Sequence, residues 1–560
     1  MAEIQSTSDM EHNEQPRSRT RRRLVFFAAA VLVLLALVFT PPLLNVNRLR
    51  RRFATSMSQS LGRPVHLDKV SLHLLPIPGF TLENLVVSED PAFGYEPVIR
   101  AQQVEATLRV SSLWRRQVEF STIRFMEVDG NHPSLNIVRN AQGRWNLQEI
   151  LVQAAHVNTA PTGQRRAGAE PRFPYIEATG ARINLKLGEE KMPFSLTDAD
   201  FALWLPSPQQ WHVRLQGIPA RTDTNASDTG VIRLEGTLDR AAKFADVPLN
   251  LTASWAHAQM GEASILVAGV DAGWRGTLDM GATLTGRLGS ASLATDIHLT
   301  DLRRADFVPA KLLDVSAHCT ATADAMTVTL VQAACTLPTS GAQPIVVSSS
   351  SLDLQRPDQS AAGIEINAVP LAWALDWTRL FSQRIPPDLQ PEGKIDGHIQ
   401  RAAGWAASPW VGDLRATLPP PALTESSTHS AAPPASTIFN VHMATATAHP
   451  HDIAALSLQL QPTVLRLGTG SQVTLAGEAD TSGYMLHLFG NASATQVKAL
   501  AKVLPPLGDG LDTILPAGKA VADGLHDVSL SCSRPWGGTP RCGTSAADVP
   551  SKKARSGKKR

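Results

Sequence analysis

The stretch VEATLRV, residues 104–110, alternates strictly between apolar and polar side chains. Because successive side chains of a β-strand point to opposite faces, it predicts a strand with one apolar and one polar face. The same period of two recurs in RINLKL (182–187), WHVRL (211–215), MTVTL (326–330) and LSLQLQP (456–462). Turn signals rich in Gly, Pro, Asn and Asp separate such stretches, which is typical of antiparallel hairpins. The sequence therefore predicts a mainly β protein.

Only a few short helices are predicted, at residues 147–156, 371–383 and 495–504, besides one at residues 47–62. In the helix at residues 47–62, apolar residues recur every four positions with arginines among them. Two interpretations stay open for it. The helix either contacts lipid headgroups at a membrane surface or packs on the first strands.

The N-terminal part contains an apolar segment, residues 24–44, without a charged residue over 21 positions. At 1.5 Å per residue, a helix of this length spans about 30 Å, the thickness of the hydrocarbon layer. We predict an uncleaved transmembrane anchor, with a cleaved signal peptide as the alternative. Representative anchor residues are Leu24, Phe26, Val31, Leu34, Leu37 and Leu44.

The charges beside this segment favour a cytoplasmic N-terminus. Five arginines precede the segment and four follow it, which is a preference of one charge under the positive-inside rule. The body of the chain is much longer than the head, so an exported body is expected.

Composition excludes several classes of function. The net charge of the 560 residues is only +2, so nucleic acid is not an expected partner. No zinc-hydrolase, serine-hydrolase, Walker or dinucleotide-binding motif is present. We therefore predict a protein that is not an enzyme, with no catalytic residue, cofactor or metal.

Four cysteines fit an oxidising compartment, although they allow three connectivities. Cys532 and Cys542 enclose a turn-rich loop and form the better candidate disulfide. Cys319 and Cys335 are the second candidate pair, with two buried thiols as the alternative. If residues 321–325 formed the turn between them, these two would not lie directly opposite.

A loose internal repeat begins each time with a glycine-led strand, followed by a turn and a returning strand. Two copies cover residues 276–302 and 393–418, and residues 524–538 look like a shortened copy. Hairpins with one apolar face must stack or curl to bury it.

The region after the anchor carries four short motifs in a fixed order: LGRPV (61–65), PIPGF (76–80), PAFG (91–94) and GRWNL (143–147). Together they resemble the N-terminal region of AsmA-family proteins. The similarity is strong to residue 147, moderate to residue 381 and weak beyond it. The motif residues are Leu61, Gly62, Arg63, Pro64, Pro78, Gly79, Gly143, Trp145 and Asn146.

This resemblance implies a single-pass protein of the bacterial inner membrane whose bulk is periplasmic and which acts in outer-membrane biogenesis. Larger relatives are thought to move phospholipid along an apolar β-groove. Membrane phospholipid is thus the expected partner, with outer-membrane or other envelope proteins as further candidates. The family supplies no catalytic residue.

The resemblance and the periodicity together divide the chain into eight regions. They are a cytoplasmic basic head (1–23), the anchor (24–44), an AsmA-like N-terminal region (45–157), a linker (158–174), a β-repeat region (175–416), a Pro/Ser-rich loop (417–436), a C-terminal β region (437–544) and a disordered basic tail (545–560).

The expected fold is an elongated, curved antiparallel sheet whose few helices leave an apolar groove. Val104, Leu108, Ile183 and Leu185 are the candidate lipid-facing residues. The first rival is a scaffold that binds outer-membrane proteins by strand addition. An envelope hydrolase is the second, and the motif search argues against it.

Overall fold

The computed structural model describes most of the chain after residue 46, together with a short helical stretch before it. The described residues are 22–23, 25–32, 47–75, 77–109, 120–148, 150, 174–187, 190–207, 209–305, 308–309, 311–380, 392–404, 408–419, 436–445, 456–468, 470–480, 482–503, 524–535, 538–539 and 541–544. The chain divides into two compact units, Met1–Leu215 and Gln216–Arg560.

The described part of the first unit contains helix α2 and a mixed sheet. Its elements are α2 (Asn47–Leu61), β1 (Val65–His66), β2 (Lys69–His73), β3 (Gly79–Val87), β4 (Ile99–Leu108), β5 (Phe120–Met126), β6 (Ser134–Arg139), β7 (Tyr175–Leu187) and β8 (Glu190–Ser207). Strand β9 (Gln210–Arg221) begins in this unit.

Most strand pairs of the first unit are antiparallel, but two are not. Strand β7 pairs in parallel with both β5 and β6. The sheet, which we expected to be mostly antiparallel, is therefore mixed in this unit. A parallel pair requires a long crossover, and the 48 residues between Met126 and Tyr175 supply one for β5.

Helix α2 covers the core of the first unit. The side chain of Phe53 is 6% exposed, and its ring lies 4.9 Å from that of Phe80 and 6.0 Å from that of Phe120. Met57 and Leu61 pack against the same core. The apolar face of this helix thus lies on the first strands, which is the second of the two interpretations of residues 47–62.

The described residues of the second unit form the remaining strands and three helices. They are β10 (Val231–Asp239), β11 (Pro248–Gln259), α5 (Met260–Ala268), β12 (Trp274–Arg287), β13 (Ser290–Arg304), β14 (Leu313–Asp324), β15 (Thr329–Leu337), β16 (Ile345–Asp353), β17 (Ala362–Pro370), α6 (Leu371–Thr378), β18 (Lys394–Arg401), β19 (Val411–Leu418), β20 (Thr437–Thr445), β21 (Leu456–Gly468), β22 (Ser471–Asp480), β23 (Gly483–Ala492), α7 (Ala494–Val503), β24 (His526–Pro535) and β25 (Arg541–Thr544). Two 3₁₀ turns lie at Phe244–Asp246 and Pro357–Gln359.

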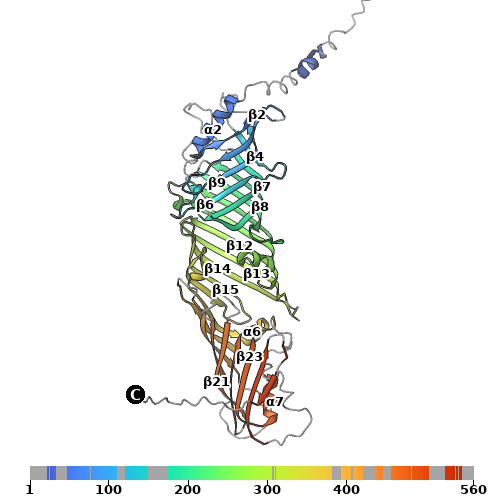
Figure 1. Cartoon of the computed structure of the whole chain (residues 1–560), viewed down its shortest axis with the longest axis vertical. Helices are drawn as coiled ribbons and strands as arrows, with labels where there is room; N and C mark the ends of the chain where they lie inside the picture. Colours follow the sequence, from blue (N-terminus) through green and yellow to red (C-terminus); the bar gives the residue numbers. More distant parts are fainter. Residues whose placement is uncertain are drawn as a thin grey trace, which may run out of the picture. The chain divides into compact units, whose positions relative to one another are not determined.

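These strands form one long antiparallel meander. From β10 to β25, each strand pairs with the next one in the chain. Figure 1 shows β12 to β15 side by side as oblique ribbons and β21 and β23 as steeper ones. This change of direction is the accumulated twist of adjacent strands. The prediction of a mainly β protein with few helices is confirmed.

The helices divide the meander into modules of six strands. Helix α5 follows β11, α6 follows β17 and α7 follows β23. The hairpin after each helix is the unit that the sequence shows as a loose repeat. Each copy also contains Gly-x-x-Asp: residues 276–279, 393–396 and 524–527.

The glycine of this signature lets two strands approach closely. A Cβ at Gly276 would lie 2.6 Å from the carbonyl oxygen of Thr300, and one at Gly393 would lie 2.5 Å from that of Thr417. Both glycines have φ near +130° (132° and 135°), which L-residues rarely adopt. Alanine is therefore strained at either position.

The aspartate of the signature stabilises a bulge in the strand before the helix. Asp279 accepts the backbone N–H of His257 at 2.9 Å, and Asp396 accepts that of Ala368 at 2.7 Å. His257 and Ala368 have φ values of 58° and 50° and lie where the strand register shifts. Each carboxylate thus holds a backbone conformation that is unfavourable by itself.

Several boundaries differ from the predictions. Residues 326–328 are part of a turn, since β15 begins only at Thr329. Helix α5 was not predicted. Helix α6 ends at Thr378, whereas α7 lies within one residue of the predicted bounds.

No helix among the described residues is both long enough and apolar enough to cross a membrane. Of the predicted anchor, residues 25–32 are described and helical. The rest of the anchor lies outside the described residues, as do nearly all of the head, residues 158–173 of the linker, residues 420–435 of the Pro/Ser-rich loop and the tail. These assignments stay predictions.

Candidate functional site

Strands β10 to β23 align one residue from each strand into a continuous row, in which all side chains except those of Thr295 and Gly412 are apolar. Each member is the direct cross-strand partner of the next, from β10 to β23. All of them are buried or half-buried. We call the following residues the apolar row: Leu234, Ala253, Ala282, Thr295, Cys319, Cys335, Val347, Ile364, Ile399, Gly412, Met443, Leu458, Ala479 and Tyr484. With strands about 4.8 Å apart, the row extends for roughly 60 Å.

Two further rows widen this apolar face over β11 to β14. Trp255, Met280, Ile297 and Ala317 are successive partners on one side of the apolar row. Leu251, Leu284, Leu293 and Ala321 are successive partners on the other. Strands β12, β14 and β15 nevertheless contain no fully buried residue. The middle of the face is therefore apolar but incompletely covered.

The opposite face of the same strands is polar. One register position away from the apolar row lies a second line of cross-strand partners. Most members are exposed. They are Asp296, His318, Thr336, Val346, Glu365, His398, Asp413, His442, Gln459 and Glu478. His318 Nδ1 lies 2.8 Å from Asp296, and His442 Nδ1 lies 2.9 Å from Asp413.

Both cysteine pairs lie on the apolar face. The structure joins Cys319 to Cys335 and Cys532 to Cys542, with Cα–Cα distances of 3.9 Å and 4.1 Å. Cys319 and Cys335 are direct cross-strand partners. The expected offset is wrong, because β14 continues to Asp324 and the turn occupies residues 325–328. Each disulfide thus joins two neighbouring strands of the face.

Helix α7 covers the C-terminal end of this face. Val497 is 2% exposed and belongs to a core with Val473 and Leu488, both 0% exposed. Leu530 and Cys532 complete the same core. The apolar face is thus closed at one end by a helix and open in its middle.

The four predicted lipid-facing residues fall into two environments. Val104 and Leu108 are 0% and 7% exposed within the core beneath α2, so their burial gives the lipid-facing assignment no support. Ile183 and Leu185 are half-buried, opposite Leu135 and Ile137 of β6. The assignment stays a prediction.

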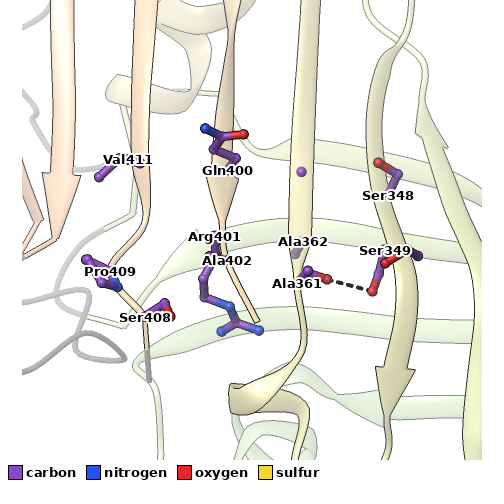
Figure 2. Close-up of a pocket in the computed structure, with 12 residues that line it drawn as sticks. Ser348, Ser349, Ala361, Ala362, Gln400, Arg401, Ala402, Ser408, Pro409 and Val411 are labelled. Atoms are coloured by element: carbon purple, nitrogen blue, oxygen red, sulfur yellow. Dashed lines mark hydrogen bonds between the residues drawn. The ribbon is translucent and has the colours of Figure 1, made fainter. Parts of the chain in front are cut away.

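The described residues line a hollow between β16 and β19 (Figure 2). It has a volume of about 540 Å³ and is lined by Ser348, Ser349, Ser350, Ala361, Ala362, Gly363, Gln400, Arg401, Ala402, Ser408, Pro409 and Val411. Ser349 Oγ donates to the carbonyl of Ala361 at 2.6 Å, and the Arg401 guanidinium donates to the carbonyls of Pro357 and Ser360. These side chains donate hydrogen bonds to backbone carbonyls, and none of the lining residues could act as a general base for a serine.

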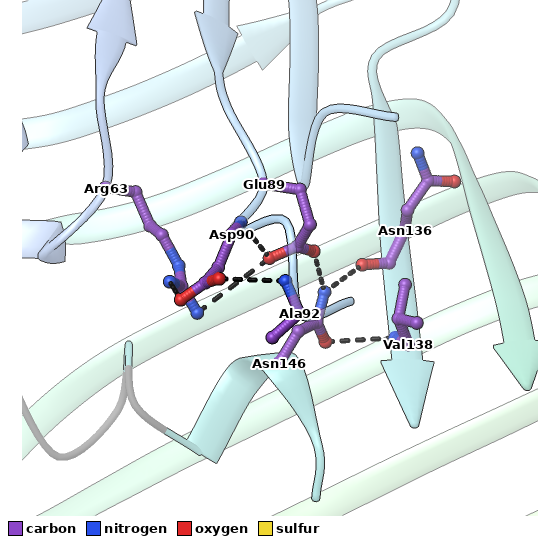
Figure 3. Close-up of polar contacts among 7 residues, drawn as sticks. All are labelled: Arg63, Glu89, Asp90, Ala92, Asn136, Val138 and Asn146. Carbon is purple, nitrogen blue, oxygen red and sulfur yellow. Dashed lines mark hydrogen bonds and ion pairs between the residues drawn. The ribbon is translucent and has the colours of Figure 1, made fainter. Parts of the chain in front are cut away.

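The motif residues Arg63 and Asn146 meet in one buried polar cluster of the first unit (Figure 3). Asn146 Nδ2 donates to Glu89 at 2.6 Å and to the carbonyl of Asn136 at 2.9 Å. Asn146 Oδ1 accepts the N–H of Val138 at 2.9 Å. Arg63 lies 2.9 Å from Asp90 and 3.8 Å from Glu89. The cluster connects three segments that are far apart in the sequence.

The two carboxylates of this cluster are shifted in opposite directions. Burial raises the pKa of Glu89, since its side chain is 1% exposed, and the bond from Asn146 only partly opposes this. The pKa of Asp90 is lowered because its carboxylate accepts the N–H of Ala92 and then the Arg63 guanidinium. Sequence reasoning missed both residues, which lie between two of the motifs.

The other motif residues shape turns and strand ends. Gly62 and Gly143 have φ values of 66° and 79°. The carbonyl oxygen of Pro64 accepts the N–H of Ser88 at 2.9 Å, and that of Pro78 accepts the N–H of Leu108 at 2.8 Å. Leu61 packs against the core under α2, and Trp145 forms a bridge with Arg139. A Cβ at Gly79 would lie 2.8 Å from His73.

No group of three metal-binding side chains that could hold a metal ion occurs among the described residues.

The chain was also compared with known proteins. No curated protein and no solved structure matches it significantly. Residues 18–186 match the model of the AsmA family, which includes all four motifs and the cluster that joins two of them. The N-terminal region of this chain, residues 18–186, is therefore similar to AsmA-family proteins.

Proposed function

We propose that this protein acts in the bacterial cell envelope by carrying lipid along the apolar face of its second unit. One observation carries the proposal: the apolar row is continuous over β10 to β23, while no described residue of β12, β14 or β15 is fully buried. The similarity of residues 18–186 to the AsmA family supports the envelope role. A face of this kind gains stability when an acyl chain covers it.

The energy of such an occupant is large enough to matter. Each buried CH₂ contributes about 0.8 kcal/mol, so an acyl chain of about 16 carbons could gain on the order of 10 kcal/mol before the costs of binding. Each strand of the row offers an acyl chain similar apolar contacts. The acyl chain could therefore shift by one strand without losing them. Movement along the face then needs no chemical step.

Adjacent residues of one strand provide a matched test. Val347 lies in the apolar row, and Val346 lies on the polar face of the same strand. A photoreactive phenylalanine analogue at position 347 should crosslink to phospholipid in cells, and the same probe at position 346 should not. The adducts are identified by mass spectrometry. Equal labelling at both positions, or none at either, would contradict the proposal.

The same experiment separates the scaffold rival. A partner protein that binds by strand addition would pair with the edge of the sheet. The scaffold alternative therefore predicts crosslinks to protein and no crosslinks to lipid from probes in the apolar row. A charge tests passage directly. Val347→Asp should abolish lipid labelling at positions further along the row, such as Ile399, whereas Val346→Asp should leave it unchanged.

A further inference from the structure

We propose that the tip of the β2–β3 hairpin, together with the exposed arginines of α2, forms a second lipid contact that docks the first unit on an anionic bilayer surface. This contact is separate from the lipid-carrying face and does not depend on it.

The hairpin tip presents two apolar side chains to solvent. His73 and Gly79 are the last paired residues, so the described residues of the tip are 74, 75, 77 and 78. Leu75 is 43% exposed and Ile77 is 53% exposed. The carbonyl oxygen of Pro78 accepts the N–H of Leu108 at 2.8 Å, which ties the base of the tip to β4. Two apolar side chains are therefore held outward.

The apolar residues on one face of the hairpin pack in the core, whereas the apolar residues of the tip do not. Val70 is 3% and Phe80 8% exposed, and both belong to the core under α2. Leu72 packs against the same core. Only two residues lie between Ile77 and Phe80, whose ring contacts Phe53 of α2. The exposed tip thus lies close to that helix.

Helix α2 carries exposed cations next to Phe53, the residue whose ring contacts Phe80 of the hairpin. Arg51 and Arg52 are exposed and directly precede the buried Phe53. A guanidinium matches the geometry of a phosphate oxygen pair, and basic residues at a membrane surface attract anionic lipid. Segments that enter the headgroup layer of a membrane combine exposed apolar side chains with basic residues, as the hairpin tip and α2 do here.

A preceding segment of the same chain favours a bilayer over a protein as the occupant. The helical residues 25–32 expose Val25, Phe26, Phe27 and Leu32 by 63–73%. Arg22 and Arg23 beside them are also exposed. Apolar helix surface of this kind requires an apolar solvent, and a lipid layer supplies it for both segments.

The test uses the full-length chain reconstituted into vesicles of equimolar phosphatidylcholine and phosphatidylglycerol. The four cysteines are paired in disulfides, so an added cysteine is a unique labelling site. An environment-sensitive fluorophore on Ile77→Cys or Leu75→Cys should emit as in an apolar medium and be quenched by doxyl-labelled lipid. The control is Val270→Cys, whose side chain is 64% exposed in the second unit.

The arginines are tested in the same vesicles. Arg51→Glu with Arg52→Glu should reduce quenching at position 77, and each lost cation should weaken surface attraction about fivefold. Labels at 77 and 75 that emit like the label at 270 would overturn the proposal. Protection of position 77 without quenching by lipid would indicate a protein partner and would also overturn it. Lipid crosslinking at Val347 is a separate readout, so either proposal can fail alone.

Discussion

Strands β4 and β14 have the same alternating pattern but different environments. In β4, Val104, Ala106 and Leu108 are 0–7% exposed, because they lie in the core that Phe53 of α2 completes. In β14, the alternating apolar residues are only half-buried, and the strand packs laterally against β13 and β15. Alternation therefore determines which face is apolar, and the presence of a covering helix determines whether that face becomes a core.

The largest expected difference is in the stability cost of a Leu→Ala substitution, which should be higher in the closed core than on the open face. Leu82→Ala removes a side chain that is 3% exposed in the closed core and should cost about 2–5 kcal/mol. Leu293→Ala on the open face should cost about 1 kcal/mol, because little cavity forms. Hydrogen exchange gives the opening free energy of each region. Equal costs would show that the open face is covered in solution.

Replacing a disulfide should have the next largest effect. In a chain-entropy model, a closed loop of this size contributes about 3 kcal/mol, so Cys532→Ala with Cys542→Ala should open β25. Cys532 is 1% exposed in the core under α7, whereas Cys319 and Cys335 are half-buried. Loss of the first pair should therefore destabilise more than loss of the second. The reverse order would contradict the contrast between the two ends of the face.

Asn146 should matter next, in the closed region. Asn146→Ala leaves Oε2 of the buried Glu89 without the Asn146 donor and the N–H of Val138 without its acceptor. The expected cost is about 2–3 kcal/mol. Gln142→Ala, at an exposed position of the preceding turn, is the control and should be neutral. Unchanged hydrogen exchange in β6 would argue against this role.

A smaller effect is expected in the modules of the open region. Gly393→Ala should cost about 1–3 kcal/mol, because φ is positive and the new Cβ meets the Thr417 carbonyl. Gly281→Ala is the matched control in β12, since no heavy atom lies within 4 Å of its Cβ position. Thermal unfolding distinguishes the two. A neutral Gly393→Ala would mean that the hairpin adapts.

The pH dependence of the polar cluster should be the smallest effect. The raised pKa of Glu89 favours folding fully below 4.5, and this contribution is lost as pH rises through the folded pKa. The lowered pKa of Asp90 favours folding above 3.8, and this contribution is lost as pH falls through the folded pKa.

Glu89→Gln should therefore abolish the loss of stability as pH rises above 4.5, while Asp90→Asn should abolish the loss as pH falls below 3.8. Hydrogen exchange of β3 and β4 over this range measures both. Identical pH profiles of the variants and the unaltered protein would contradict the assignment.

Much of the strand content was predictable from the sequence, because period-two alternation has a direct physical cause. Helix α5 was missed because Met260–Ala268 is short, begins without a side-chain cap and lies between strand-like segments. The parallel pairing of β7 was missed because alternation carries no information about strand direction.

The apolar row could not be predicted for a related reason. It depends on the register of every strand pair, and register shifts occur at bulges such as those beside His257 and Ala368. The candidate residues Val104 and Leu108 were recognised as apolar correctly. Their burial depends on α2, which the sequence left with two interpretations.

The six-strand modules have a consequence for how such a protein can change in length. Six is even, so an added module leaves the direction of every later strand and the identity of its apolar side unchanged. With strands about 4.8 Å apart, one module adds about 29 Å of surface. An in-frame duplication from one helix to the next could therefore extend the molecule by a fixed increment while its ends keep their own partners.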